Sequence, residues 1–158
     1  MSNSIRKYGK RNNLALDLWT KLARSSSTFG KLTVRHISSF GLTEPQFGVL
    51  EALGHLGPLR LGELSRKRLV SGGNMTCVVD NLEKEGLVER IHSTEDRRQI
   101  LVQLTAKGKT LFDDIFVNHA EYVGQIASVL TEQEQETLAG LLKKLGLSLM
   151  EQYRSELG

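Results

Sequence analysis

Apolar residues recur at three- and four-residue steps along most of this chain, which is the spacing that builds one apolar helix face. The pattern changes to alternation near Ile100, Val102 and Leu104, where the chain is rich in Val and Ile, and this alternation is typical of a strand. The predicted helices span residues 13–40, 44–56, 61–68 and 71–86, and two more begin at Thr105 and Thr131. Strands near 87–92 and 99–104 complete a mainly α-helical fold with one small β-hairpin.

Local residue chemistry supports several of these boundaries. Thr43-Glu-Pro-Gln46 and Thr131-Glu-Gln-Glu134 both have the capping-box pattern, in which a threonine side chain and a Gln or Glu three residues later satisfy free amides at a helix start. Ser71 is predicted to be an N-cap, and Gly86 suits a left-handed position just after a helix end, with Leu87 as the accompanying apolar contact.

Composition and charge exclude several classes of protein. The 158 residues include 21 Lys and Arg against 18 Asp and Glu, which gives a net charge of +3. A single cysteine cannot form an internal disulfide, and four scattered histidines do not have metal-ligand spacing, so no metal and no cofactor are expected. No charge-free apolar stretch is long enough for a membrane span and the N-terminus lacks a signal-peptide core, which predicts a soluble cytoplasmic protein. No spacing supports a nucleophile with its base, so no catalytic residues are predicted.

Three short helices followed by a hairpin, in that order, make a winged helix-turn-helix, whose third helix enters the major groove of DNA. We therefore divide the chain into an N-terminal arm and dimerisation helix (1–42), a winged helix-turn-helix (43–108) and C-terminal dimerisation helices (109–158), all within one continuous structural unit. The leucine stripes of the terminal helices favour a homodimer. The competing interpretation is that these stripes form an intrachain core.

The helix predicted at 71–86 has two distinct faces. Met75, Val78, Val79 and Leu82 form an apolar stripe, and the opposite face carries small or polar residues. The outward residues are Gly73, Thr76, Cys77, Asp80 and Lys84. Small residues at the helix start leave room for a phosphate, and Asn74 and Thr76 can contact base edges or phosphate oxygens. Alternatively, Ser71 and the glycines serve only as a helix cap and a loop.

Basic residues cluster on either side of this helix. Residues 60–109 contain ten basic and seven acidic residues, so clustering is more informative than net charge. Arg66-Lys67-Arg68 precedes the helix and Arg97-Arg98 lies at the hairpin tip, where contacts to a DNA backbone are expected. Asp96 is placed to hold an arginine guanidinium in a fixed direction for a narrow minor groove. Solvated charge runs, or a wing that binds protein rather than DNA, are the alternatives.

Three motifs in a fixed order, Gly86-Leu87-Val88-Glu89-Arg90, Asp96-Arg97-Arg98 and Leu104-Thr105-Ala106-Lys107-Gly108, resemble the MarR family of winged-helix transcription regulators. The resemblance is strongest over about residues 44–110. It implies a homodimer that binds pseudo-palindromic promoter DNA, commonly as a repressor, with a recognition helix in each major groove and a wing arginine in each minor groove. Ser71, Asn74 and Thr76 match the family's recognition helix, and Asp96 and Arg98 match its wing pair. The full predicted DNA-binding set is Arg66, Ser71, Gly73, Asn74, Thr76, Cys77, Asp96, Arg97 and Arg98.

Cys77 departs from this resemblance, because many family members have a basic residue at that position. A thiol on the outward face of a DNA-reading helix is open to oxidation, which suggests a redox-sensing repressor as an alternative function. The simpler interpretation is a small side chain that fits the groove.

The resemblance also implies a small lipophilic or phenolic effector, since many relatives are released from DNA by such molecules. Residues available to line a cavity are Tyr8, Trp19, His36, His55 and Tyr122. Aromatic and histidine residues at helical spacing are more often part of a core, so the ligand-binding residues are left unassigned.

Overall fold

The computed structural model describes residues 8–68, 72–93, 96 and 98–157. These residues form a mainly helical fold with a small sheet, as the hydrophobic pattern predicts. The elements in chain order are α1 (Lys10–Ser38), α2 (Glu44–Leu56), β1 (Leu59–Arg60), α3 (Leu61–Arg68), α4 (Gly72–Lys84), β2 (Val88–His92), β3 (Ile100–Leu104), α5 (Ala106–Ala127) and α6 (Glu132–Leu157). The chain divides into two compact units, Met1–Ala120 and Glu121–Gly158.

The sheet has three antiparallel strands in the order β1-β3-β2, so the prediction of a two-stranded hairpin was incomplete. The hairpin strands β2 and β3 pair from Val88 opposite Leu104 to His92 opposite Ile100. On the other side of β3, Leu59 pairs with Val102. This third strand has only two residues, too few to produce an alternating pattern, and its pairing partner lies some forty residues further along the chain.

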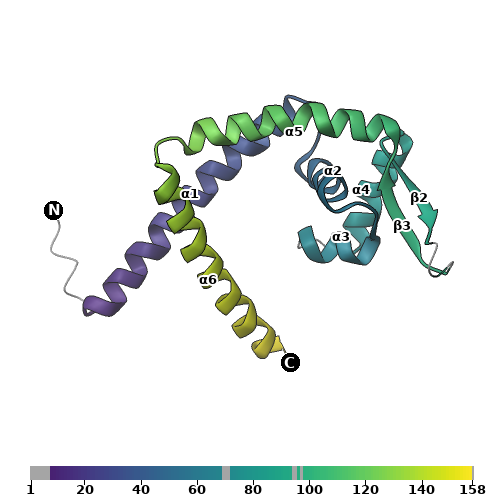
Figure 1. Ribbon diagram of the computed structural model, residues 1–158. Helices are drawn as coiled ribbons and strands as arrows, with labels where there is room; N and C mark the ends of the chain where they lie inside the picture. The colour runs from purple at the N-terminus through teal and green to yellow at the C-terminus, as the bar shows by residue number, and fades with distance from the viewer. Residues whose placement is uncertain (1–7, 69–71, 94–95, 97, 158) are drawn as a thin grey trace. The chain divides into compact units, whose positions relative to one another are not determined.

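The winged helix-turn-helix has its own hydrophobic core, in which α2, α3 and α4 pack together beside the hairpin (Figure 1). The predicted apolar stripe of α4 lies inside this core. Met75, Val79 and Leu82 are fully buried, and Val78 is nearly so. The other large side chains that are fully buried are Val49, Leu50, Leu64, Val88 and Val102. This shared core therefore fixes which face of α4 is turned outward.

The capping box predicted at Thr43–Gln46 and the left-handed glycine predicted at Gly86 are both present. The Thr43 hydroxyl accepts a hydrogen bond from the Gln46 amide, and the Gln46 side chain accepts one from the Thr43 amide at 2.9 Å. Gly86 has φ of +70°, and the Leu87 amide bonds back to the Leu82 carbonyl at 2.9 Å, which closes the C-terminus of α4.

Helix α5 begins against the corner between α4 and β2. The Thr105 hydroxyl donates to the Gly86 carbonyl at 2.7 Å and accepts from the Gly108 amide at 3.0 Å. The Lys107 ammonium donates to the Glu85 carbonyl at 2.7 Å. A Cβ on Gly108 would lie 1.9 Å from the Leu87 carbonyl oxygen, so the backbones of α5 and the corner touch at this residue. The motif at 104–108 therefore joins α5 to the end of the candidate reading helix.

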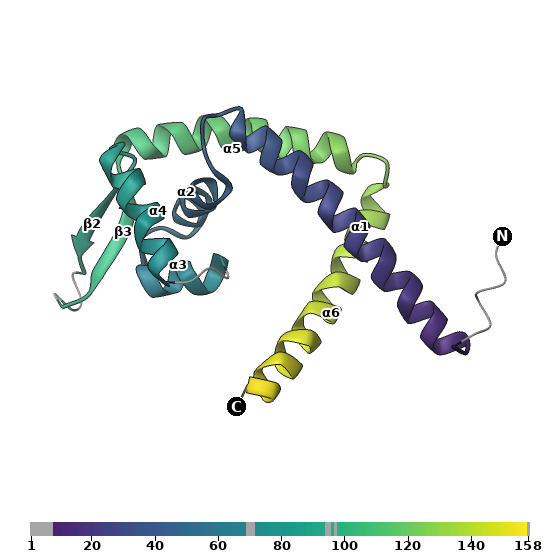
Figure 2. The ribbon, with the colours of Figure 1, turned by 180° about the vertical axis from the view of Figure 1, so that it is seen from behind.

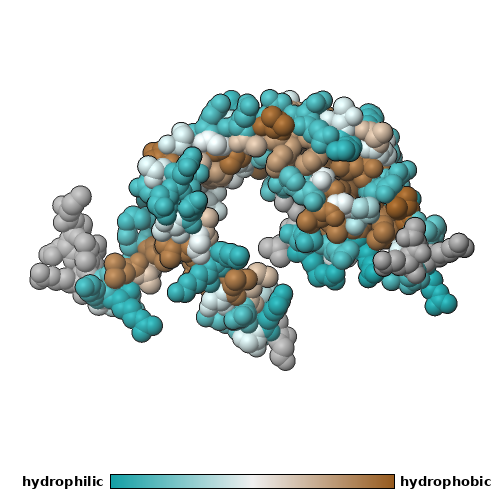
Figure 3. All heavy atoms as spheres, viewed as in Figure 1, coloured by the Kyte–Doolittle hydropathy of each residue, from teal (hydrophilic) through white to brown (hydrophobic). Residues whose placement is uncertain are grey.

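Large apolar side chains are exposed on the terminal helices of both units. In α1 these are Leu14, Leu16, Leu18, Trp19, Phe29, Leu32 and Val34, of which Trp19 is 66% exposed. In α6 they are Leu138, Leu141, Leu142, Leu147, Leu149, Met150 and Tyr153. Figure 3 shows hydrophobic side chains reaching the surface outside the winged helix-turn-helix as well as on it. None of the helices in the described part of the chain is long and apolar enough to cross a membrane.

Candidate nucleic-acid interface

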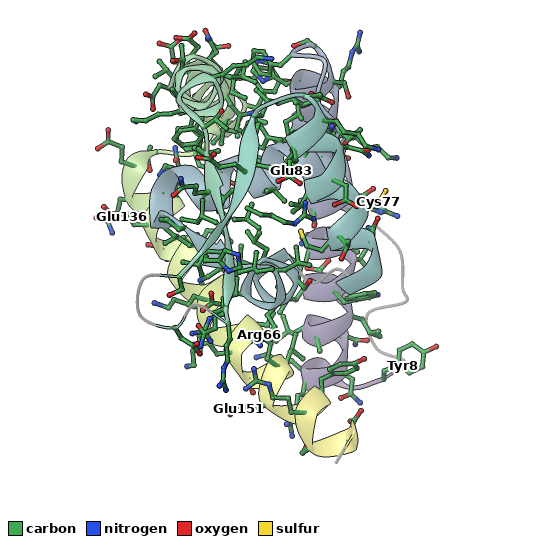
Figure 4. All side chains as sticks on the ribbon, turned by 90° about the vertical axis from the view of Figure 1, so that its right-hand side faces the viewer. Tyr8, Arg66, Cys77, Glu83, Glu136 and Glu151 are labelled. Atoms are coloured by element: carbon green, nitrogen blue, oxygen red, sulfur yellow. The ribbon has the colours of Figure 1, made fainter. Side chains whose placement is uncertain are left out.

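The outward face of α4 is polar, and its residues are accessible. Gly73, Asn74, Thr76 and Cys77 are all exposed, on the side of the helix opposite the buried stripe. Figure 4 shows the Cys77 side chain pointing away from the body of the winged helix-turn-helix. Ser71, predicted to cap this helix, lies outside the described residues. The described face has the size and hydrogen-bonding groups that base-edge contacts in a major groove require.

The Cys77 thiol is accessible to solvent. Its sulfur accepts a weak hydrogen bond from the Asn81 side-chain amide at 3.9 Å, one helical turn further along α4. Cys77 therefore lies beside the polar residues of the reading face rather than in the core.

The Asp96 carboxylate holds the backbone of the wing tip in place. Among the described residues, this carboxylate accepts hydrogen bonds from the Arg98 backbone amide at 3.0 Å and from the Gln99 side-chain amide at 3.0 Å. The aspartate therefore fixes the backbone of the turn, and the exposed Arg98 side chain extends from this fixed turn. Arg97 lies outside the described residues.

Helix α3 supplies the remaining basic cluster. Arg66 and Lys67 are both exposed in the last turns of α3, and Figure 4 shows Arg66 on the periphery of the winged helix-turn-helix. Their ammonium and guanidinium groups are available for contacts to phosphate oxygens, as the prediction requires.

Arg90 has a role that charge counting along the sequence missed. Its guanidinium, on β2, forms ion pairs with both Asp80, at 2.5 Å, and Glu83 of α4. The Arg90 amide also donates to Glu83 at 3.1 Å. Burial by itself would lower the pKa of Arg90, but the two carboxylates outweigh it and raise the pKa. Arg90 thus joins α4 to the wing and neutralises two carboxylates of α4. The sequence pattern did not indicate this ion pair, because Glu83 lies in a helix and Arg90, seven residues later, lies in the following strand.

The residues considered for an effector cavity have different environments. Tyr8 and Trp19 are more than half exposed. His55 packs edge-on against Phe112 and Phe116, with ring centroids 5.2 Å and 4.5 Å apart. No cluster of three or more His, Cys, Asp or Glu side chains suited to a metal ion occurs within residues 8–68, 72–93, 96 and 98–157.

Comparisons with known proteins agree with this architecture. The model of the MarR family matches residues 42–100. The HTH-type transcriptional regulator MhqR of Bacillus subtilis is 38% identical over 134 residues, which cover 85% of this chain and 92% of MhqR. The HTH-type transcriptional repressor MdtR of the same organism is 32% identical over 66% of this chain and 68% of its own length. The solved structure of NadR in complex with 4-hydroxyphenylacetate has a TM-score of 0.69 and 25% identity, over 80% of this chain and 89% of NadR.

Proposed function

The chain belongs to the MarR family of DNA-binding, winged helix-turn-helix transcription regulators, and from this membership we propose that it represses transcription as a homodimer bound to pseudo-palindromic promoter DNA. The observation that carries the proposal is the exposed face of α4, with Gly73, Asn74, Thr76 and Cys77 opposite a fully packed stripe. The wing and α3 add Asp96, Arg98 and Arg66 to this DNA-contacting set. Ser71 and Arg97 belong to the same proposal from their sequence positions.

The exposed apolar side chains of the terminal helices support the homodimer. Residues such as Leu18 and Trp19 of α1, and Leu141 and Tyr153 of α6, are each more than half exposed in the single chain. Large apolar side chains that are exposed in number on one helix are usually covered by a partner. A second copy would also supply a second reading helix, as a pseudo-palindromic site requires. Such a regulator would act in the cytoplasm, where we place it.

We also propose release from DNA by a small phenolic or lipophilic effector. The structure of NadR with 4-hydroxyphenylacetate supports this effector class. The binding residues remain unassigned.

The experiment that tests the function is fluorescence anisotropy of the purified protein on DNA from immediately upstream of its own gene. Excess nonspecific competitor is present, and two salt concentrations separate phosphate contacts from base readout. Competitor-resistant binding that saturates at one dimer per site is expected. If the protein binds neither this DNA nor any duplex selected from a random pool specifically, the wing is better interpreted as a protein-binding surface. Tolerance of the charge reversal Arg98→Glu would agree with that interpretation.

Exposure of Cys77 on the reading face favours one alternative mode of control, a thiol switch. Peroxide would convert the thiol to a sulfenic acid and release water, placing a larger polar group between α4 and DNA. We expect a peroxide-driven switch to release wild-type protein from DNA while Cys77→Ser stays bound, with dithiothreitol restoring the wild type. Equal behaviour of the two proteins in peroxide would reject the switch and leave Cys77 as a small groove-facing side chain.

A further inference from the structure

Two imidazoles from distant parts of the sequence meet where α1, α2 and α5 pack together. Nδ1 of His36, in the last turn of α1, lies 3.3 Å from Nδ1 of His119 in α5. The His36 ring also packs edge-on against Phe40, with centroids 4.9 Å apart, and the His119 ring packs on Phe47 of α2 at 4.7 Å. Both views of the ribbon show the C-terminal part of α1 running alongside α5 (Figures 1 and 2).

The contact has a simple requirement for protons. A hydrogen bond between two Nδ1 atoms needs a proton on one of them and a lone pair on the other. The neutral pair and the singly protonated pair both meet this requirement. When both rings are protonated, two N–H groups and two positive charges face each other in a half-buried place. The second proton therefore opposes the contact.

The charged groups around His119 come from both neighbouring helices. Burial lowers the pKa of His119 first of all, and repulsion by His36 of α1 lowers it further. Glu51 of α2 acts in the opposite direction and is outweighed. The packed surfaces of α1, α2 and α5 around His36 and His119 form a seam between these helices. His55 of α2 lies further along this seam, against Phe112 and Phe116 of α5. His119 thus resists protonation while the three helices stay packed.

The seam connects the terminal helix α1 to the DNA-reading elements. Ile37, beside His36, is buried in the core of the winged helix-turn-helix. At its other end, α5 is held to the α4–β2 corner through Thr105, Lys107 and Gly108. A change in the packing of α1 against α5 would therefore be transmitted through α5 to the α4–β2 corner of the winged helix-turn-helix.

We propose that the His36–His119 contact is a proton-sensitive latch, closed when at most one ring is protonated and open when both are, and that opening it weakens DNA binding. This proposal rests on the proposed function. A histidine whose pKa is lowered on folding stabilises the folded state at pH values above its ordinary pKa, which is 6.5 for His119. This contribution to stability is lost as the pH falls below that value. The latch should therefore open in mildly acidic solution.

The test is the pH dependence of DNA affinity of the full-length protein, at constant ionic strength and with EDTA present to exclude metal ions. The probe is the duplex found by the anisotropy experiment. Between about pH 7.5 and about pH 5.5 we expect the affinity of the wild type to fall about tenfold, within the range that is usual for coupling between two sites. His36→Asn and His119→Asn keep polar atoms near the Nδ1 position but do not titrate, so their affinity should stay constant or rise.

The sign of the effect is diagnostic, because protonating histidines on a DNA-binding protein normally strengthens binding to phosphates. His92→Asn, which removes an exposed imidazole from the wing, is the matched control and should keep the acid-induced loss. Constant or rising wild-type affinity in acid, or an equal loss in both asparagine variants, would overturn the latch.

A second measurement needs no DNA and separates this proposal from the proposed function. Histidine NMR titrations with amide hydrogen exchange follow the seam directly. We expect His119 to titrate below its ordinary pKa, and amides in the last turns of α1 to lose protection as it does so. An ordinary titration with unchanged protection would overturn the latch even if DNA binding is confirmed. A titrating, opening seam in a protein that binds no DNA would overturn only the consequence for DNA.

Discussion

Replacing Gly108 with alanine is expected to lower the free energy of unfolding by about 3 kcal/mol, the upper part of the range for overpacked sites. The added Cβ would lie 1.9 Å from the Leu87 carbonyl oxygen. A backbone atom cannot rotate away as a flexible side chain can, so α5 must shift from the α4–β2 corner. Alanine is the better helix former by about 1 kcal/mol, which offsets only part of this cost.

The measurement is urea unfolding followed by circular dichroism, at one fixed protein concentration because the proposed homodimer would make the midpoint concentration-dependent. Gly62→Ala is the matched control, since a Cβ at this exposed helical position meets no atom within 4 Å. Its stability should stay unchanged or increase slightly. Equal midpoints for Gly108→Ala and the wild type would mean that the corner adapts at little cost and that the close contact does not determine stability.

Replacing Arg98 with alanine is expected to reduce specific DNA affinity about 100-fold, because the proposed homodimer would lose one contact of about 1–3 kcal/mol in each half-site. The side chain is exposed, and its backbone amide is fixed by the Asp96 carboxylate. Asp96→Ala should cause a smaller loss, since it frees the turn and leaves the guanidinium present.

Competition anisotropy on specific and random duplexes measures this effect. Arg24→Ala removes the same charge from an exposed position in α1 and should change affinity less than about threefold. If Arg98→Ala weakens specific and random DNA equally and reduces the salt dependence, Arg98 contacts phosphate rather than a groove. Affinity equal to that of the wild type would remove the wing from the DNA-contacting set.

Much of the winged helix-turn-helix could be predicted because its signals are local. The Thr43–Gln46 capping box, the left-handed Gly86 and the buried stripe of α4 each depend on residues within a few positions of one another. Helix periodicity alone therefore separated the core face of α4 from its exposed polar face.

The features that could not be predicted depend on contacts between distant residues. Strand β1 exists because Leu59 finds Val102, and the His36–His119 contact joins residues 83 positions apart. Charge counting treated Arg90 and Lys107 as available cations, but one is paired with two carboxylates and the other bonds to the Glu85 carbonyl. A count of charges does not reveal which of them are already neutralised within the fold.

The Arg90 ion pairs also bear on how an operator for this regulator should be analysed. Because Arg90 links α4 to β2, the elements proposed for the major and minor grooves are parts of one rigid reader. The distance between the base pairs that they contact is then set by the protein and not by the DNA. Mutations in a half-site should accordingly be interpreted as changes to one binding site that both elements contact together. Inserting a base pair within a half-site would separate the contacts of α4 from those of the wing, whereas changing the spacer would move one whole half-site relative to the other.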